Sequence, residues 1–220
     1  MKNFVPAQFF DRTTQPHVMT LVALACISAL AMNIFLPSLP SMAAYYNTTP
    51  SVISLSVAVY LGASAVIQLF SGPLSDRIGR RPVILFSLAL FIFASLAIIW
   101  APTVEMFLVL RFIQAFAATT MVLSRAIVRD TVGKNAAASK IAYVTMGTAV
   151  APMLGPGIGG YLDTYFGWQS VFAFLGAIGL VIFLITWFDL GETAPLQASR
   201  QSSQKADYTE LLKSQRFWGY

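Results

Sequence analysis

The sequence predicts an all-α, polytopic membrane protein built as a bundle of six transmembrane helices. Of its 220 residues, 57% are hydrophobic and only 10% are charged, whereas soluble domains carry about 25% charged residues. The hydrophobic residues form long runs, and a helix of about 20 residues crosses the hydrocarbon core of a bilayer. The runs lack the alternation of a barrel strand, and a helix satisfies its own backbone hydrogen bonds in lipid.

Six apolar runs of suitable length follow one another along the chain. The first is preceded by Lys2, Arg12 and His17 and is too long for the apolar region of a cleaved signal peptide, so we expect it to be retained. The predicted spans are residues 18–37, 52–74, 83–101, 107–128, 141–162 and 168–188. They divide the chain into an N-terminal cytoplasmic segment (1–17), the six-helix bundle (18–189) and a cytoplasmic linker (190–220).

The positions of the basic residues predict the orientation of the bundle. Connections 38–51, 102–106 and 163–167 contain no Lys or Arg, whereas basic residues precede the first span, follow the sixth and occupy the other two connections. By the positive-inside rule, both ends of the chain are expected to face the cytoplasm. The membrane is expected to be the plasma (inner) membrane of the cell. The net charge of +5 does not indicate nucleic-acid binding, because the basic residues lie between apolar spans.

Composition also argues against catalysis. The one histidine, His17, precedes the first span, so no serine and histidine pair is expected inside the membrane. The one cysteine, Cys26, lies within an apolar run and has no partner for a disulfide. Clustered metal ligands and a phosphate-binding Gly-x-x-x-x-Gly-Lys loop are missing from the sequence. We therefore expect neither an enzyme nor a bound metal or cofactor.

Span 4 carries an arginine that is hard to explain as an anchor. At 100° per residue along span 4, Arg111, Gln114, Arg125 and Arg129 share one face, which cannot look at lipid. Arg125 is close enough to the cytoplasmic end to reach water, but Arg111 is not. Spans 3 and 6 have few polar side chains and are expected to form the outer support. Arg111, Gln114 and Asn33 are the candidates for coupling inside the membrane, and Asn33, Tyr60 and Gln68 are expected to line a common substrate cavity.

The connection between spans 2 and 3 combines helix breakers with charges. Proline and glycine interrupt helices, and unpaired charges are costly in lipid, so the segment is predicted to be a turn at the membrane surface. We further expect Asp76, with Arg77 and Arg129, to form a cytoplasmic charge latch that holds the outward-open state against the other helical bundle. The predicted breakers are Gly72, Pro73, Gly79 and Pro82, and the charged residues are Asp76, Arg77, Arg80 and Arg81.

Span 5 is rich in small residues and proline. Small residues four positions apart let another helix approach closely, and proline deletes backbone donors and bends the helix axis. This combination predicts a closely packed hinge. The residues concerned are Ala151, Pro152, Gly155, Pro156, Gly159 and Gly160.

These segments together resemble the major facilitator superfamily. Residues 72–85 resemble its loop motif G-x-L-x-D-R-x-G-R-[KR], and residues 151–160 resemble the antiporter motif of its drug-exporting members. Residues 111–114 are similar to its span 4 motif R-x-x-Q-G, with Ala115 in place of the glycine. Residues 33–40 and 124–130 resemble the bicyclomycin-resistance (Bcr/CflA) group of drug:proton antiporters.

The resemblance implies a secondary active transporter that exports small amphipathic molecules, such as antibiotics, by alternating access and in exchange for protons. Two features depart from it. Asn33 stands where the group has an aspartate, and no Asp or Glu lies in the middle of a predicted span. The family has twelve spans, so we expect a second six-helix half, missing here or supplied by another chain. Alternatives are a truncated or half-size carrier without transport of its own, and a metabolite transporter of the same superfamily.

Overall fold

The described part of the protein consists of helices and their connections. The computed structural model describes residues 9–12, 14–131 and 134–193, and this part contains no strand, so the predicted fold class is confirmed. The predicted linker lies almost wholly outside the described residues. The helices are α1 (Val18–Asn33), a 3-10 helix η1 (Leu36–Ser38), α2 (Leu39–Tyr45), α3 (Pro50–Ile78), α4 (Arg80–Ile98), α5 (Val104–Gln114), α6 (Ala117–Thr131), α7 (Lys134–Phe166) and α8 (Trp168–Asp189).

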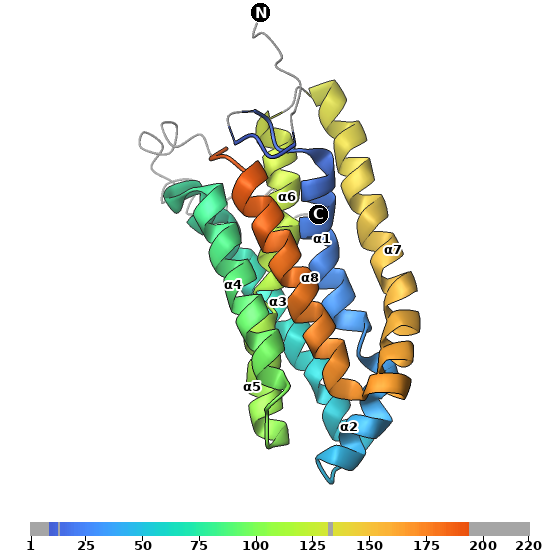
Figure 1. Cartoon of the computed structure of the whole chain (residues 1–220). Coiled ribbons are helices and arrows are strands. Elements are labelled where there is room, and N and C mark those ends of the chain that lie inside the picture. The colour runs from blue at the N-terminus through green and yellow to red at the C-terminus, as the bar shows by residue number, and fades with distance from the viewer. Residues whose placement is uncertain (1–8, 13, 132–133, 194–220) are drawn as a thin grey trace, which may run out of the picture.

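Six stretches of helix in the described residues are long and apolar enough to cross a membrane. Span 1 comprises α1, η1 and α2, span 4 comprises α5 and α6, and the other four correspond to α3, α4, α7 and α8. The spans run alternately up and down in one bundle (Figure 1). Residues 9–17, the α3–α4 turn and the ends of α6 and α8 lie together at one end, which we call the basic end (Figure 1).

The turn between spans 2 and 3 is shorter than the sequence predicted. Gly72 and Pro73 were expected to break the helix, but α3 continues through both to Ile78. Transmembrane helices tolerate proline because neighbouring groups satisfy the backbone that it leaves unpaired. Pro82 lies in the first turn of α4, where backbone N–H groups have no intrahelical partner in any case. The break is at Gly79, whose φ of 115° suits glycine.

Span 4 is not one continuous helix. Between α5 and α6, Phe116 N donates to Ile113 O at 3.1 Å and Ala118 N donates to Ala115 O at 2.9 Å. Such bonds across three residues are those of a 3-10 helix, which turns further per residue than an α-helix. The single face predicted for the arginines assumed one α-helix, and the 3-10 segment changes their relative rotation. Arg111 is fully buried, Arg125 is half-buried and Arg129 is exposed.

Within the described bundle, α3 and α7 have the most uncovered surface, and the outer, supporting position of spans 3 and 6 stays a prediction. Of the most apolar stretch of each helix, 28% is buried in α3 and 17% in α7, against 44% in α4 and 39% in α8. Two glycines of α8 help to explain why α4 and α8 are more buried. A Cβ at Gly176 would meet Leu96 of α4, and one at Gly179 would meet Phe91 of α4. Close packing between α4 and α8 therefore leaves α3 and α7 as the open helices of the bundle.

Candidate functional site

Arg111 lies inside the bundle with no exposed surface. It is in α5, about two turns from the first residue of that helix. Its Nη1 donates to the carbonyl oxygen of Ala31 at 3.2 Å and to Oε1 of Gln114 at 2.5 Å. Its guanidinium carbon lies 4.3 Å from the ring centroid of Phe35 and 4.7 Å from that of Tyr60. The cation therefore contacts two aromatic rings, a backbone carbonyl and an amide.

The end of α1 explains why a cation is stable at this depth. Ala31 is in the last turn of α1, which ends at Asn33, and the last carbonyls of a helix lack intrahelical donors. These carbonyls also carry the partial negative charge of the helix dipole. Arg111 thus satisfies an orphan acceptor with a positively charged donor, while the two rings supply cation–π contact.

Two more helices take part in the site, α4 by hydrogen bonds through Gln114 and α3 by the contact of the Tyr60 ring with Arg111. Gln114 Nε2 donates to Ser95 Oγ of α4 at 2.8 Å, and Ser95 Oγ donates to a carbonyl of its own helix at 2.7 Å. Tyr60 of α3 is 2% exposed, and its hydroxyl lies 3.1 Å from both Oγ and the carbonyl oxygen of Ser28 in α1. A single polar network therefore joins α1, α3, α4 and α5.

No acid neutralises Arg111 among the described residues, whose ion pairs all involve Arg80. Nε and Nη2 of Arg111 are buried and have no hydrogen-bond partner there either. Buried donors without partners are costly, and in native proteins they often have a functional reason. The geometry leaves two charged donors available for a group that the described residues do not supply.

Of the predicted site residues, Gln114 and Tyr60 contact Arg111, and the structure shows no contact of Asn33 or Gln68 with it. Asn33 Nδ2 donates to the carbonyl of Ala29 in its own helix at 2.8 Å. Gln68 is half-buried and lies about two turns from Tyr60 towards the basic end. Sequence reasoning missed Ser28 and Ser95 in this network, because hydroxyl residues are common in helix contacts and give no distinctive pattern.

The charged turn between α3 and α4 forms a second polar cluster. Arg80 Nη2 pairs with Asp76 Oδ1 at 2.7 Å, and its Nε pairs with Asp130 Oδ2 of α6 at 3.1 Å. Its Nη1 also donates to Ser75 Oγ at 2.5 Å. Asp76 is thus paired within this bundle, while Arg77 is exposed and forms no ion pair with a described residue.

Glu192, just beyond α8, caps the start of α4. Its carboxylate accepts from the backbone N–H of Arg80 at 2.8 Å and of Arg81 at 3.4 Å. A Cβ at Gly79 would collide with this carboxylate, so the glycine is needed for close approach as well as for its φ. An acid at a helix N-terminus is favoured by the exposed N–H groups and the helix dipole.

The motif in span 5 lies where α7 packs against α1. Pro152 and Pro156 are inside the continuous helix α7. A Cβ added at Gly159 would overlap the carbonyl oxygen of Ile34, and one at Gly155 would lie 3.5 Å from the backbone nitrogen of Ile34. Gly160 faces Pro37. The glycines therefore allow nearly direct backbone contact between the two helices at the end of α1.

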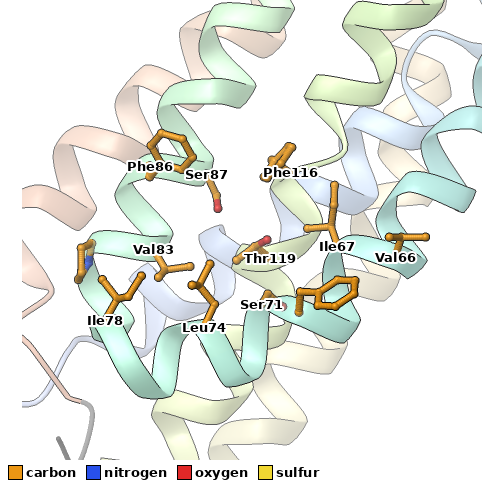
Figure 2. A pocket seen from close by; sticks show the side chains of 12 residues that line it. Val66, Ile67, Ser71, Leu74, Ile78, Val83, Phe86, Ser87, Phe116 and Thr119 are labelled. Carbon is orange, nitrogen blue, oxygen red and sulfur yellow. The ribbon is translucent and has the colours of Figure 1, made fainter.

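Two apolar grooves flank the bundle. One, of about 850 Å³, lies between α1 and α7 and is lined by Cys26 and Gly147 among others, with Lys140 near one end. The other, of about 490 Å³, lies among α3, α4 and the α5–α6 segment. Figure 2 shows the apolar side chains of this second groove around the hydroxyl groups of Ser71, Ser87 and Thr119. Asn33, Tyr60 and Gln68 line neither groove.

The chain belongs to the Major Facilitator Superfamily, whose family model matches residues 21–220. It is 36% identical over 167 residues to a chloramphenicol resistance protein of Pseudomonas aeruginosa, covering 74% of this chain and 39% of that protein. It is 31% identical over 191 residues to the multidrug resistance protein MdtL of Escherichia coli, covering 86% of this chain and 49% of that protein. The predicted family and its drug-resistance relatives are thereby confirmed.

A solved structure shares the fold. The crystal structure of the human organic anion transporter MFSD10 (TETRAN) superimposes with a TM-score of 0.68 at 22% sequence identity, covering 82% of this chain and 48% of that chain. The chain spans about half the length or less of the relatives described here. The family consists of transporters rather than enzymes, which agrees with the expectation from composition.

Proposed function

We propose that this bundle is one half of a carrier that exports small amphipathic molecules, antibiotics among them, by alternating access. The proposal rests on Arg111 of α5, which is buried against the end of α1 and has no acid partner among the described residues. The bundle that holds it belongs to this family. Carriers of this type bind substrate near the membrane midplane between two helical repeats and rock one against the other. The names of the relatives, chloramphenicol resistance and multidrug resistance, support the substrate class.

The second half is proposed to cover α3 and α7. Both helices are poorly buried in this bundle, and both expose small residues. A Cβ at Gly62 of α3 or at Gly157 of α7 would meet nothing within 4 Å. Small residues on an open face permit close helix packing. Arg77, exposed at the end of α3, is our candidate for the charged contact with that half.

Arg111 is proposed to position the end of α1 while the two halves move. It holds the Ala31 carbonyl, and α1 in turn packs on the glycine face of α7. Its two unpaired donors are available to a carboxylate of the other half or to an anionic group of the substrate. Protons are the proposed coupling ion, with the carboxylate supplied by the other half because Asn33 does not titrate.

The groove between α1 and α7 is the proposed wall of the substrate path. The groove is apolar, and its volume of about 850 Å³ suits a drug-sized molecule. It lies beside α7, which we expect the second half to cover. The basic end is proposed to face the cytoplasm of a plasma (inner) membrane, since the Lys-free and Arg-free connections all lie at the opposite end.

A chimera tests transport directly. The 220 residues are joined to the C-terminal half of the Pseudomonas aeruginosa chloramphenicol resistance protein and expressed in cells that lack their own drug exporters. We expect lower chloramphenicol accumulation with the chimera than with an empty vector, and we expect Arg111→Gln to abolish the difference. A well-inserted chimera that leaves accumulation unchanged for chloramphenicol and for a panel of amphipathic drugs would contradict the proposal.

Cys26 provides a natural reporter of the groove, because it is the one cysteine of the chain and lines the space between α1 and α7. In the chimera, made free of other cysteines, substrate that binds there should slow alkylation of Cys26 by a small maleimide. A cysteine placed at Glu105, which is exposed in the first turn of α5 and lines neither groove, serves as the control whose labelling rate should not respond. Equal labelling of Cys26 with and without a transported drug would exclude this groove.

A further inference from the structure

A tryptophan at the end of α8 is flanked by two arginines from distant parts of the chain. The guanidinium carbon of Arg12 lies 5.6 Å from the Trp187 ring centroid, and that of Arg81 lies 5.2 Å from it. Arg12 also lies 5.8 Å from the ring of Phe188. These distances are within the range of cation–π attraction. We call Arg12, Arg81, Trp187 and Phe188 the arginine–aromatic patch.

Two acids near this patch, Asp189 and Glu192, accept hydrogen bonds from backbone groups. Asp189 is fully buried, and its two carboxylate oxygens accept from the backbone N–H of Phe10 at 3.1 Å and of His17 at 3.0 Å. Glu192 accepts from the backbone at the start of α4. In the part of the chain that the structure describes, no ion pair reaches Arg12 or Arg81. The patch therefore carries two cations without a carboxylate partner.

The hydrogen bonds of Arg81 leave part of its guanidinium free. Nη2 donates to the carbonyl oxygen of Trp187 at 3.2 Å, which fixes the side chain beside the indole. Nε is buried and has no partner among the described residues. Arg12 is exposed, and no hydrogen bond of its side chain to a described residue is present. The donors left for an anion are therefore those of the exposed Arg12 guanidinium and of the part of the half-buried Arg81 guanidinium that reaches the surface.

The patch lies at the level where a membrane meets water. Trp187 and Phe188 are in the last turn of a transmembrane span, and they are 42% and 50% exposed. Phe10, 54% exposed, has its ring 6.4 Å from that of Phe188. Tryptophan and other aromatic side chains gather at membrane interfaces, where lipid headgroups lie.

We propose that the arginine–aromatic patch binds the phosphate of an anionic phospholipid at the basic end of the bundle. The two guanidinium groups donate to the phosphate oxygens, as arginine does at many phosphate sites. The exposed rings pack against the upper part of the acyl chains. A lipid fits better than a free phosphate because the exposed rings belong to the last turn of a transmembrane span, where acyl chains are within reach. A choline headgroup fits poorly because its cation would face two arginines.

Native mass spectrometry of the detergent-purified 220-residue chain tests the site. Phosphatidylglycerol, phosphatidylcholine and inorganic phosphate are titrated separately. We expect tight binding of one phosphatidylglycerol, weak binding of phosphatidylcholine and no competition by phosphate. Arg12→Gln and Arg81→Gln should each lower the phosphatidylglycerol affinity about fivefold, which is the usual effect of one basic residue at an anionic membrane surface. Trp187→Leu should also weaken binding, because it removes the ring that both cations contact.

Arg129→Gln is the matched control, because Arg129 is exposed at the end of α6, outside the patch, and its loss changes the net charge equally. Its lipid affinity should stay unchanged. Arg12 is an exposed residue before α1, so Arg12→Gln retains the fold even if Arg81→Gln does not. Equal affinity for the two lipids, competition by inorganic phosphate, or an equal loss in Arg129→Gln would each overturn the proposal.

Discussion

Two arginines of this protein are stabilised in opposite ways. Arg80, at the basic end, pairs with two carboxylates whose side chains are 37% and 22% exposed. Arg111, inside the bundle, contacts no carboxylate of the described residues and relies on a backbone carbonyl, an amide and two rings. Ion pairs near water are weak and screened by salt, whereas polar contacts inside the membrane are not screened.

The basic end around Arg80 and the end of α1 around Arg111 therefore play different parts in the fold. The carboxylates of the basic end can exchange partners at lower cost, because water reaches them and compensates part of their charge, although Arg80 itself is buried. The end of α1 cannot, since each buried acceptor there depends on a particular donor. We therefore expect the fold to depend on the region around Arg111 and the basic end to tolerate change.

The largest effect is expected from Arg111→Met. The substitution leaves the Ala31 carbonyl and Gln114 Oε1 without their donor, and each buried unsatisfied group costs about 1 to 3 kcal/mol. The free energy of unfolding should fall by about 3 kcal/mol, measured by circular dichroism during titration of detergent-solubilised protein with dodecyl sulfate. The loss should be the same at low and high salt. If Arg111→Met lowers the free energy of unfolding by less than Arg80→Gln does, the fold does not depend more on Arg111 than on Arg80.

Gly159→Ala is expected to come next. The added Cβ would overlap the Ile34 carbonyl, so α1 and α7 must move apart, and overpacking of this kind costs about 1 to 3 kcal/mol. Gly157→Ala is the control on the same helix, because its Cβ would meet nothing within 4 Å. The control should be neutral or more stable, since alanine favours helix over glycine. The same titration checks both variants, and equal stability of the two would show that α1 and α7 are not in close contact.

Arg80→Gln should have a smaller, salt-dependent effect. It removes two partly exposed ion pairs and a hydrogen bond to Ser75, which together are worth about 1 to 2 kcal/mol. The difference from the wild type should shrink as sodium chloride is raised. A destabilisation that salt leaves unaltered would mean that this cluster behaves like a buried one.

Asp76→Asn is expected to have the smallest effect, below about 1 kcal/mol, because Arg80 keeps its second partner, Asp130. Thermal unfolding of purified protein measures it. If the variant proves as unstable as Arg111→Met, Asp76 holds the α3–α4 turn in a way that its one ion pair does not explain.

Much of the fold followed from the sequence because hydropathy sets the depth of a residue in the membrane. The runs of apolar residues predicted all six spans, and the residues between them predicted the positions of the turns. The boundaries were less accurate: α3 continued past Pro73, and span 4 divided into α5 and α6. The identity of one residue, such as a proline or an alanine, does not determine whether a transmembrane helix bends or continues. Contacts with neighbouring helices decide whether the distortion is stable.

The candidate site was predictable in part. An arginine inside an apolar run is conspicuous, and Gln114 follows one turn later, so both were recognised from sequence. The Ala31 carbonyl, Phe35 and Ser95 were not placed beside it, because they belong to other helices and none has a distinctive pattern. The same holds for Asp130 and Glu192 around Arg80.

The sequence by itself determined that the chain crosses the membrane six times and where its charges lie along the membrane normal. The tertiary structure alone decided which helices touch, and so which groups meet Arg111, Arg80 and Trp187. The reason is physical: the burial of apolar residues in lipid fixes depth but treats all directions in the membrane plane alike. Rotation and neighbours depend instead on shape and on individual hydrogen bonds between helices.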